Sequence, residues 1–312
     1  MKNLTLTRSI LTTAAIASPA AMSACGGGEE DTTPRAVTLN FDIVAGTTPV
    51  RCGTAVSGLG TGAVAAQPKD LRYYVSAVKF IKADGTEVPL TLGNNDDWNL
   101  TVGNDSVSLI DLEDATGSCP TATGTAATNA KITGTVPGGA GAYTGVKFEM
   151  GVPFALNHSL YSSATKPLDL AAMAWSWQSG RKFAKVEVTD PAGATGTWTA
   201  KTFNFHLGST GCTGNPANGE TVACTVPNRA VVKLASFNAT TQKIALDVKT
   251  LLAGEDVTVN AAGAAGCMSG GTDPECDTVF TAMDLGWNAA GTGTGLPLSG
   301  GASQTVFKAL AQ

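Results

Sequence analysis

Short segments in which apolar and polar residues alternate recur along this chain of 312 residues. Residues 36–44 alternate with period two, which is typical of a β-strand with one buried face. Residues 71–81 form a second such segment, and a turn leads the chain back through 87–92 as a hairpin. Further strands are predicted at 107–112, 130–136, 145–150, 182–188, 201–207, 231–234 and 244–248, a helical turn at 249–252 and a short helix at 280–285. This pattern predicts a mostly β protein, an antiparallel β-sandwich with long loops.

The N-terminus has the features of an export signal spanning residues 1–24. Lys2 and Arg8 precede a stretch of mostly apolar or small residues, 10–21, that is too short for a permanent membrane span. Small residues immediately before Cys25 resemble a lipoprotein signal, in which this cysteine carries the lipid. The alternative is an ordinary signal peptide. Either signal predicts an exported protein, periplasmic or anchored to the outer membrane.

The remaining chain is predicted to contain one domain. Residues 25–35 are a flexible polar tether, 36–288 form the β domain, and 289–312 are a loosely ordered tail rich in small residues. Turn-rich stretches at 114–129, 156–180, 208–228 and 253–302 are predicted to be loops. Loops of such length are uncommon unless they are functional or cross-linked.

Six cysteines follow Cys25, and an even number in an exported chain predicts disulfides. The alternative, a metal site made of thiolates, lacks the CxxC spacing that such sites usually have. Short separations along the chain favour two pairs and leave a third, so that the predicted disulfides are Cys212–Cys224, Cys267–Cys276 and Cys52–Cys119. Two of them would cross-link the long loops.

Composition and motifs exclude several classes of function. The net charge of −5 argues against a nucleic-acid partner, which would need a basic surface. The chain has no GxSxG motif, no P-loop and no dinucleotide-binding glycine motif, so no enzyme is predicted. The acidic run Asp111–Asp114 is a candidate cation site, although a solvated strand end is the preferred interpretation.

The chain contains only two histidines, His158 and His206, and imidazole is the commonest protein ligand of copper and zinc. On its predicted strand His206 opposes the neighbouring phenylalanines and shares a face with Gly208, which would allow another group to approach closely. Asn157 favours a turn before His158 and could hydrogen-bond to a ligand. Met173 is a possible soft third donor, and core packing is its alternative role.

Several segments together resemble the MbnP-like family of exported copper-binding proteins, also called the metallo-mystery pair four-Cys motif family. The resemblance runs from about residue 36 to about residue 288. It is most specific in Gly-Val-Pro-Phe-Ala-Leu-Asn-His (151–158), Met-Ala-Trp-Ser-Trp-Gln-Ser-Gly-Arg-Lys-Phe (173–183) and Phe-His-Leu-Gly-Ser-Thr-Gly-Cys (205–212), with support from 71–78, 107–113 and 267–276. One departure is Arg181, where the family more often has tyrosine.

The resemblance implies a function. Members of the family are encoded beside a di-haem cytochrome c peroxidase-like (MbnH/MauG-like) enzyme, which in characterised relatives oxidises a tryptophan to kynurenine. By position His158 and His206 match the histidine ligands of Cu(I), and Trp175 and Trp177 match the tryptophan pair. The expected protein therefore binds copper without turnover of its own. The alternatives are a cell-surface β-sandwich adhesin or scaffold lipoprotein and, less favoured, a copper-dependent periplasmic oxidoreductase.

Overall fold

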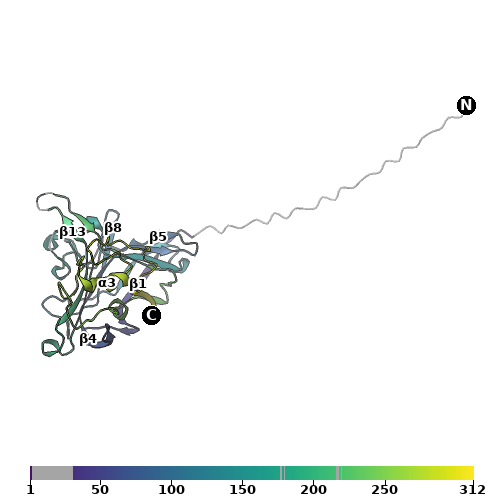
Figure 1. Cartoon of the computed structure of the whole chain (residues 1–312). Coiled ribbons are helices and arrows are strands. Elements are labelled where there is room, and N and C mark those ends of the chain that lie inside the picture. Colours follow the sequence, from purple (N-terminus) through teal and green to yellow (C-terminus); the bar gives the residue numbers. More distant parts are fainter. Residues whose placement is uncertain (2–30, 176–177, 179, 216–217, 219) are drawn as a thin grey trace. The chain divides into compact units, whose positions relative to one another are not determined.

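The computed structural model describes Met1 and residues 31–312, apart from 176–177, 179, 216–217 and 219. Thr32–Gln312 forms one compact unit, which Figure 1 shows coloured along the sequence. Cys25 and nearly all of the predicted signal sequence therefore lie outside the described residues. Within the described part, no helix has the length and apolar character that crossing a membrane requires.

The unit contains a first sheet built around the long N-terminal strand. β1 runs parallel to one neighbour and antiparallel to the other. A short strand, β2 (Thr48–Pro49), folds back on the end of β1. Along the main path of this sheet, the order of the strands is β18 (Phe307–Ala311), β16 (Gln242–Asp247), β1 (Pro34–Ala45), β9 (Lys131–Pro137) and β6 (Thr91–Leu92).

The second sheet is built around β4 (Val64–Ile81), a strand of 18 residues. Its main path is β15 (Ala230–Leu234), β10 (Gly145–Met150), β4, β11 (Ala184–Thr189), β12 (Thr202–Leu207) and β17 (Gly266–Cys267). The strands off this path are β3 (Val56–Leu59), β5 (Glu87–Pro89) and β8 (Asp105–Asp111), which pair with β4, and β7 (Asn99–Val102), which pairs with β8. A separate two-stranded hairpin consists of β13 (Thr210–Thr213) and β14 (Ala223–Val226).

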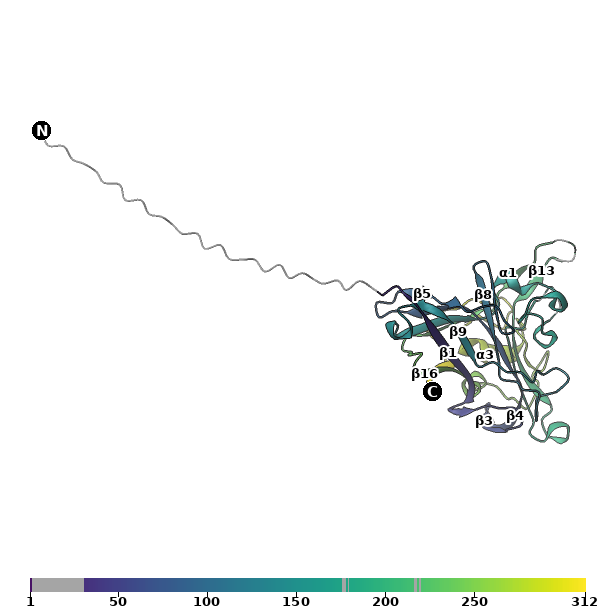
Figure 2. The same ribbon diagram turned by 180° about the vertical axis from the view of Figure 1, so that it is seen from behind.

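Helices are short and lie in the connections. The α-helices are α1 (Phe154–Asn157), α2 (Val248–Leu251) and α3 (Asp277–Ala282). The 3-10 helices within the described residues are η1 (Ala140–Ala142), η2 (Tyr161–Ser163), η3 (Ala171–Met173), η4 (Gly193–Thr195) and η6 (Pro274–Cys276). Figure 2 shows α1 next to β13.

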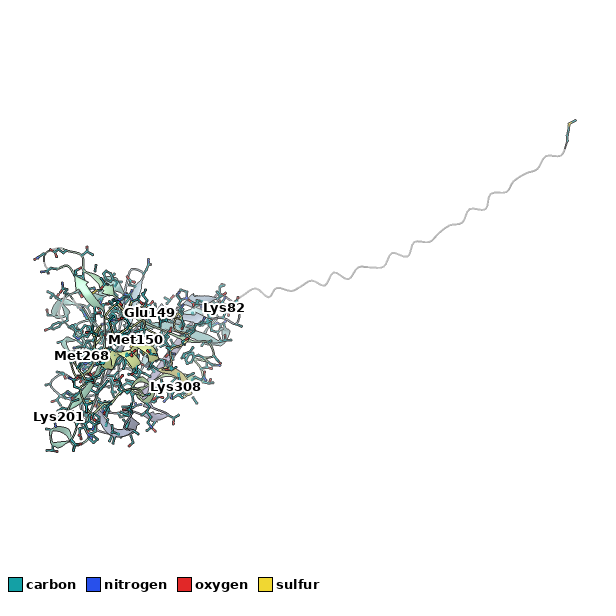
Figure 3. The ribbon with its side chains drawn as sticks, viewed as in Figure 1. Lys82, Glu149, Met150, Lys201, Met268 and Lys308 are labelled. Carbon is teal, nitrogen blue, oxygen red and sulfur yellow. A yellow bond between two sulfur atoms is a disulfide. The ribbon has the colours of Figure 1, made fainter. Side chains whose placement is uncertain are left out.

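Aromatic rings from both sheets pack against one another in the core. The ring centroids of Phe41 on β1 and Phe148 on β10 are 5.9 Å apart, and those of Phe307 on β18 and Tyr73 on β4 are 5.7 Å apart. Burial of each ring contributes about 2 kcal/mol to stability. Figure 3 shows Met150, the last residue of β10, in the same interior, where it is fully buried. The two sheets therefore form a sandwich around one hydrophobic core.

The predicted mostly β sandwich is confirmed, and each predicted strand and helix has a counterpart. The sequence pattern underestimated β4, because Pro68 and the polar residues beside it hide the alternation at its start. It also missed the β13–β14 hairpin inside the predicted loop 208–228. The tail 289–312 differs from the loosely ordered segment that was predicted, since buried Val306 leads into β18, which pairs with β16.

Candidate metal centre

A row of polar side chains crosses the second sheet on the face opposite the aromatic core. His206 on β12 pairs in register with Lys185 on β11. Lys185 pairs in turn with Arg72 on β4, and Arg72 pairs with Asp111 on β8. Directly paired residues point to the same face of a sheet, whereas the next residue along a strand, such as buried Phe205, points to the other. The predicted orientation of His206 on its strand is therefore confirmed.

This row is charged and nevertheless buried. Arg72 donates to both carboxylate oxygens of Asp70, with an Nε–Oδ1 distance of 2.8 Å. Lys185 Nζ also contacts Asp70 and lies 3.0 Å from Glu187 Oε1. Taking a charge out of water is costly unless an opposite charge compensates it. Positive and negative side chains alternate from Arg72 through Asp70 and Lys185 to Glu187. Each charge therefore has an opposite neighbour, which compensates it and fixes its position.

The acidic run Asp111–Asp114 begins at the last residue of β8 and lies at the other end of the row. The prediction that this run is a solvated strand end is wrong. Asp111 and Glu113 are both fully buried. The chain folds back over them, so that Thr125 donates from its backbone nitrogen to Glu113 and from its hydroxyl to Asp111. Burial raises the pKa of Asp111 to about 7, although the charge of Arg72 partly offsets this effect.

His206 is fixed by the same network. Its Nε2 lies 2.7 Å from Glu187 Oε1. Burial alone would raise the pKa of Glu187, but the hydrogen bond with His206 and the charge of Lys185 outweigh it and lower that pKa to about 2. Glu187 is therefore an acceptor, which places the imidazole proton on Nε2 and leaves a lone pair on Nδ1. This buried Nδ1 forms no hydrogen bond to the described residues.

His158 lies at the end of α1 in a different setting. The side-chain nitrogen of Asn157 is 3.1 Å from His158 Nε2. The carbonyl oxygen of the same amide accepts a hydrogen bond from the backbone nitrogen of Arg181, which fixes the orientation of the amide. The amide nitrogen is therefore the donor and His158 Nε2 the acceptor, so the lone pair of this ring is on Nε2, where it accepts the hydrogen bond from Asn157. Nε2 is also 3.4 Å from Sγ of Cys224.

Both imidazoles are neutral at pH 7. Burial lowers the pKa of His206, and the opposing effect of Glu187 does not restore it to its ordinary value. Burial also lowers the pKa of His158, with the charge of Arg181 acting in the same direction and the backbone of Gln178 partly opposing both. A neutral imidazole with a free lone pair is the form that binds a metal ion.

Arg181 holds the loop that carries His158. Its guanidinium is 1% exposed and donates to backbone carbonyls on both sides of His158, at 2.7 Å from Asn157 O and 2.6 Å from Ser159 O. Further hydrogen bonds reach Leu168 O and the Ser159 hydroxyl. In the sequence, Arg181 is distinguished only as a departure from a family pattern. Its five donors make it the residue that fixes the backbone around His158.

Trp175 connects the region of His158 to that of His206. A Cβ atom built on Gly208 would lie 2.5 Å from Cζ3 of Trp175 and 3.0 Å from the backbone oxygen of Arg181. The indole therefore packs on Gly208, two residues after His206, and the predicted close approach at this glycine is confirmed. Arg181 contacts Gly208 through its carbonyl group and the residue before His158 through its nitrogen. This contact chain links the two histidine-bearing segments.

Two predicted site residues remain, Trp177 and Met173. Trp177 lies outside the described residues. Met173 is fully buried in the hydrophobic core, and its role as a third metal ligand stays a prediction. A cavity of about 210 Å³ opens beside Trp175 and Arg181 and is also lined by residues 159–161. The indole thus has open space next to it.

The three predicted disulfides are present. Cys52–Cys119 closes the longest loop, Cys212–Cys224 bridges β13 and β14, and Cys267–Cys276 joins β17 to η6. Three disulfides are typical of a protein that matures in an oxidising compartment outside the cytoplasm. The fold and its cross-links thus define an extracytoplasmic β-sandwich protein with a histidine-containing candidate metal centre.

Comparison with known proteins agrees with this class. The family model MbnP matches residues 34–269, so the chain belongs to the MbnP family. A solved structure, MbnP from Methylosinus trichosporium, is 34% identical, with a TM-score of 0.76, and the alignment covers 89% of this chain and 99% of that one. No relative was found among the curated proteins.

Proposed function

We propose that this protein binds copper as Cu(I) through His158 and His206, beside a tryptophan of the 175/177 pair. Support comes from the family, from the two neutral imidazoles and from the packing of Trp175 on Gly208. The protein is a metal-binding protein without turnover of its own. The observation that carries the proposal is the buried Nδ1 of His206, which has no hydrogen-bond partner in the described part of the chain while Glu187 holds the opposite ring nitrogen.

The donor set fits Cu(I) better than a structural zinc ion. Cu(I) accepts soft or neutral donors, and two imidazoles supply neutral nitrogen. A structural zinc site needs four protein ligands, whereas all six cysteines of the folded unit are engaged in disulfides. Copper bound here would be held by two rings that hydrogen bonds already orient, and the amide of Asn157 would give up its hydrogen bond to His158 Nε2 on binding. His206 would offer Nδ1 and His158 would offer Nε2.

The partner in this proposal is a di-haem cytochrome c peroxidase-like enzyme that oxidises Trp175 or Trp177 to kynurenine. An electron-rich indole can lose electrons to a haem enzyme, and the arylamine and ketone of kynurenine are polar groups able to contact the metal. The cavity next to Trp175 offers space for the more polar product, whose opened ring has a different shape. Lipidation of Cys25 would hold the protein at the outer membrane.

The test is metal analysis of the exported full chain, with Cu(I) affinity measured by competition with a coloured chelator. We expect one Cu(I) per chain in the wild type and loss of tight binding in His206→Ala and in His158→Ala. A variant at a partly buried tryptophan away from the centre, Trp98→Phe, serves as the control and keeps the affinity. Unchanged affinity after replacement of both histidines would refute the proposal and favour an adhesin or scaffold. Co-expression with the haem enzyme should add mass to the peptide that contains residues 175 and 177.

A further inference from the structure

The Cys212–Cys224 disulfide lies directly against His158. The Nε2 atom of His158 is 3.4 Å from Sγ of Cys224. The potential ligand atoms of His158, Cys212 and Cys224 all lie within 4.8 Å of one another. A disulfide sulfur is a poor metal ligand, but the thiolates that reduction would produce are among the best ligands for Cu(I).

The separation of His158 Nε2 and Cys224 Sγ fits a metal ion bound to both atoms, and the second sulfur becomes available once the disulfide opens. Typical metal–nitrogen and metal–sulfur bonds of about 2.0 and 2.3 Å, meeting near the tetrahedral angle, place nitrogen and sulfur about 3.5 Å apart. The measured separation of 3.4 Å is close to this value. The lone pair of His158 is on the same nitrogen, because Asn157 donates to it. The imidazole therefore needs no change of tautomer to bind such an ion.

Of the three disulfides, this one is the most accessible to a reductant. Cys212 and Cys224 are both partly exposed, whereas both members of Cys267–Cys276 are fully buried. Cys119 is also buried, which protects one sulfur of the remaining pair. Attack by a thiolate on a disulfide requires access to a sulfur atom.

The position of the disulfide in the fold also favours its opening. β13 and β14 form their own two-stranded sheet and belong to neither layer of the sandwich. Hydrogen bonds from Ser209 to Pro227 O and from Gln178 to Gly214 O hold the hairpin independently of the sulfurs. Opening the disulfide would therefore leave the aromatic core intact and keep both cysteines near His158.

From these observations we infer that Cys212, Cys224 and His158 form a thiol-controlled site for a soft metal ion. Two equivalents of a small thiol, or one dithiol, reduce the disulfide to two cysteine thiols and are themselves oxidised to a disulfide. Binding of Cu(I) then releases the two thiol protons and gives one nitrogen and two sulfur ligands. The oxidised protein lacks this site. The inference needs His158 but not His206, so it is separable from the proposed two-histidine site.

The experiment uses the exported full chain carrying His206→Ala, which removes the two-histidine site. The protein is treated with limiting dithiothreitol, freed of reductant without oxygen, and titrated with Cu(I). We expect two additional labelled thiols per chain relative to the oxidised protein, in the peptides of Cys212 and Cys224. We also expect one Cu(I) per reduced chain and none per oxidised chain. The matched control, His206→Ala with Cys212→Ser and Cys224→Ser, should bind none in either state.

A spectroscopic measurement identifies the ligands. X-ray absorption of the reduced, loaded protein should show one nitrogen and two sulfur neighbours, and His158→Gln should lose the nitrogen. Labelling of Cys119 or Cys267 first, or an opened pair that takes up no copper, would overturn the inference. So would a nitrogen neighbour that persists in His158→Gln. Absence of copper from the oxidised wild type would instead count against the two-histidine site alone.

Discussion

The two histidines are held in contrasting ways. His206 lies on a regular strand of the second sheet, and its ring is fixed by Glu187 within a chain of buried ion pairs. His158 lies in an irregular loop, where backbone carbonyls converge on the Arg181 guanidinium and a neighbouring amide fixes the ring. His206 is therefore positioned by charge pairing within the sheet, whereas His158 is positioned by one guanidinium that orders its loop.

The largest expected effect is on the loop side, in Arg181→Met. Removal of the guanidinium leaves two buried carbonyl groups and one partly buried carbonyl group without this donor, at about 1–3 kcal/mol for each buried group. We therefore expect a loss of roughly 3 kcal/mol or more in the free energy of unfolding, measured by urea denaturation. Arg229→Met is the matched control, because Arg229 is partly exposed and pairs with Glu149 at 3.5 Å. That variant should lose about 1 kcal/mol or less. Equal losses in the two variants would show that Arg181 does not order the loop.

On the strand side, Glu187→Gln should weaken copper binding while keeping the shape of the side chain. The amide no longer acts only as an acceptor, so the tautomer and orientation of His206 are no longer fixed. Loss of such a partner of a ligand histidine typically costs about 10–100-fold in metal affinity. Cu(I) competition measures the change, with Glu149→Gln as a control that should leave affinity unaltered. Wild-type affinity in Glu187→Gln would mean that the ring is fixed by something else.

A third variant acts where the two regions meet. Gly208→Ala places a methyl group 2.5 Å from Cζ3 of Trp175, so the indole has to move. We expect a changed tryptophan fluorescence spectrum and a destabilisation of about 1–2 kcal/mol. Gly141→Ala is the control, because nothing lies within 4 Å of the added atom there. If the two variants behave alike, the packing of Trp175 on the histidine strand is refuted.

The smallest expected effect concerns pH and the far end of the charged row. Because burial raises the pKa of Asp111 from 3.8 to about 7, the folded state binds a proton that the unfolded state has lost between these values. The contribution of Asp111 to stability should therefore fall as pH rises from about 4 to about 7. Asp111→Asn should reduce this slope, measured as the denaturation midpoint against pH.

A second carboxyl group with a raised pKa makes it possible to assign the pH dependence to individual residues. Burial also raises the pKa of Glu255 to about 7, but Glu255 lies outside the row. Glu255→Gln should therefore reduce the slope without altering copper affinity, and the double variant should reduce it further. A slope that neither variant changes would contradict the assignment.

Periodicity predicted the strands because it follows directly from which side chains face the core. It could not predict that the opposite face of the second sheet is also covered. Lys185 and Glu187 are the polar residues of an alternating strand. Such residues ordinarily face water, yet both are buried. Only the contacts between distant segments, such as Thr125 with Glu113, show this covering.

The site was predicted unevenly for the same reason. His158 and His206 were singled out by their rarity and by the family resemblance, and Gly208 by its place on the strand. Glu187 was missed because a single glutamate in a polar phase carries no distinguishing signal. Arg181 was visible as a departure from the family, but its hydrogen bonds to three carbonyl groups depend on the loop geometry. Sequence thus indicated the candidate ligands and left open the residues that position them.

The most direct test of the central claim is a crystal structure of the full chain loaded with Cu(I) under oxidised conditions. We expect a single copper ion bonded to Nδ1 of His206 and Nε2 of His158, with all three disulfides closed. Two ions on separate histidines, or copper bound to neither ring, would contradict the claim that strand and loop supply one shared site.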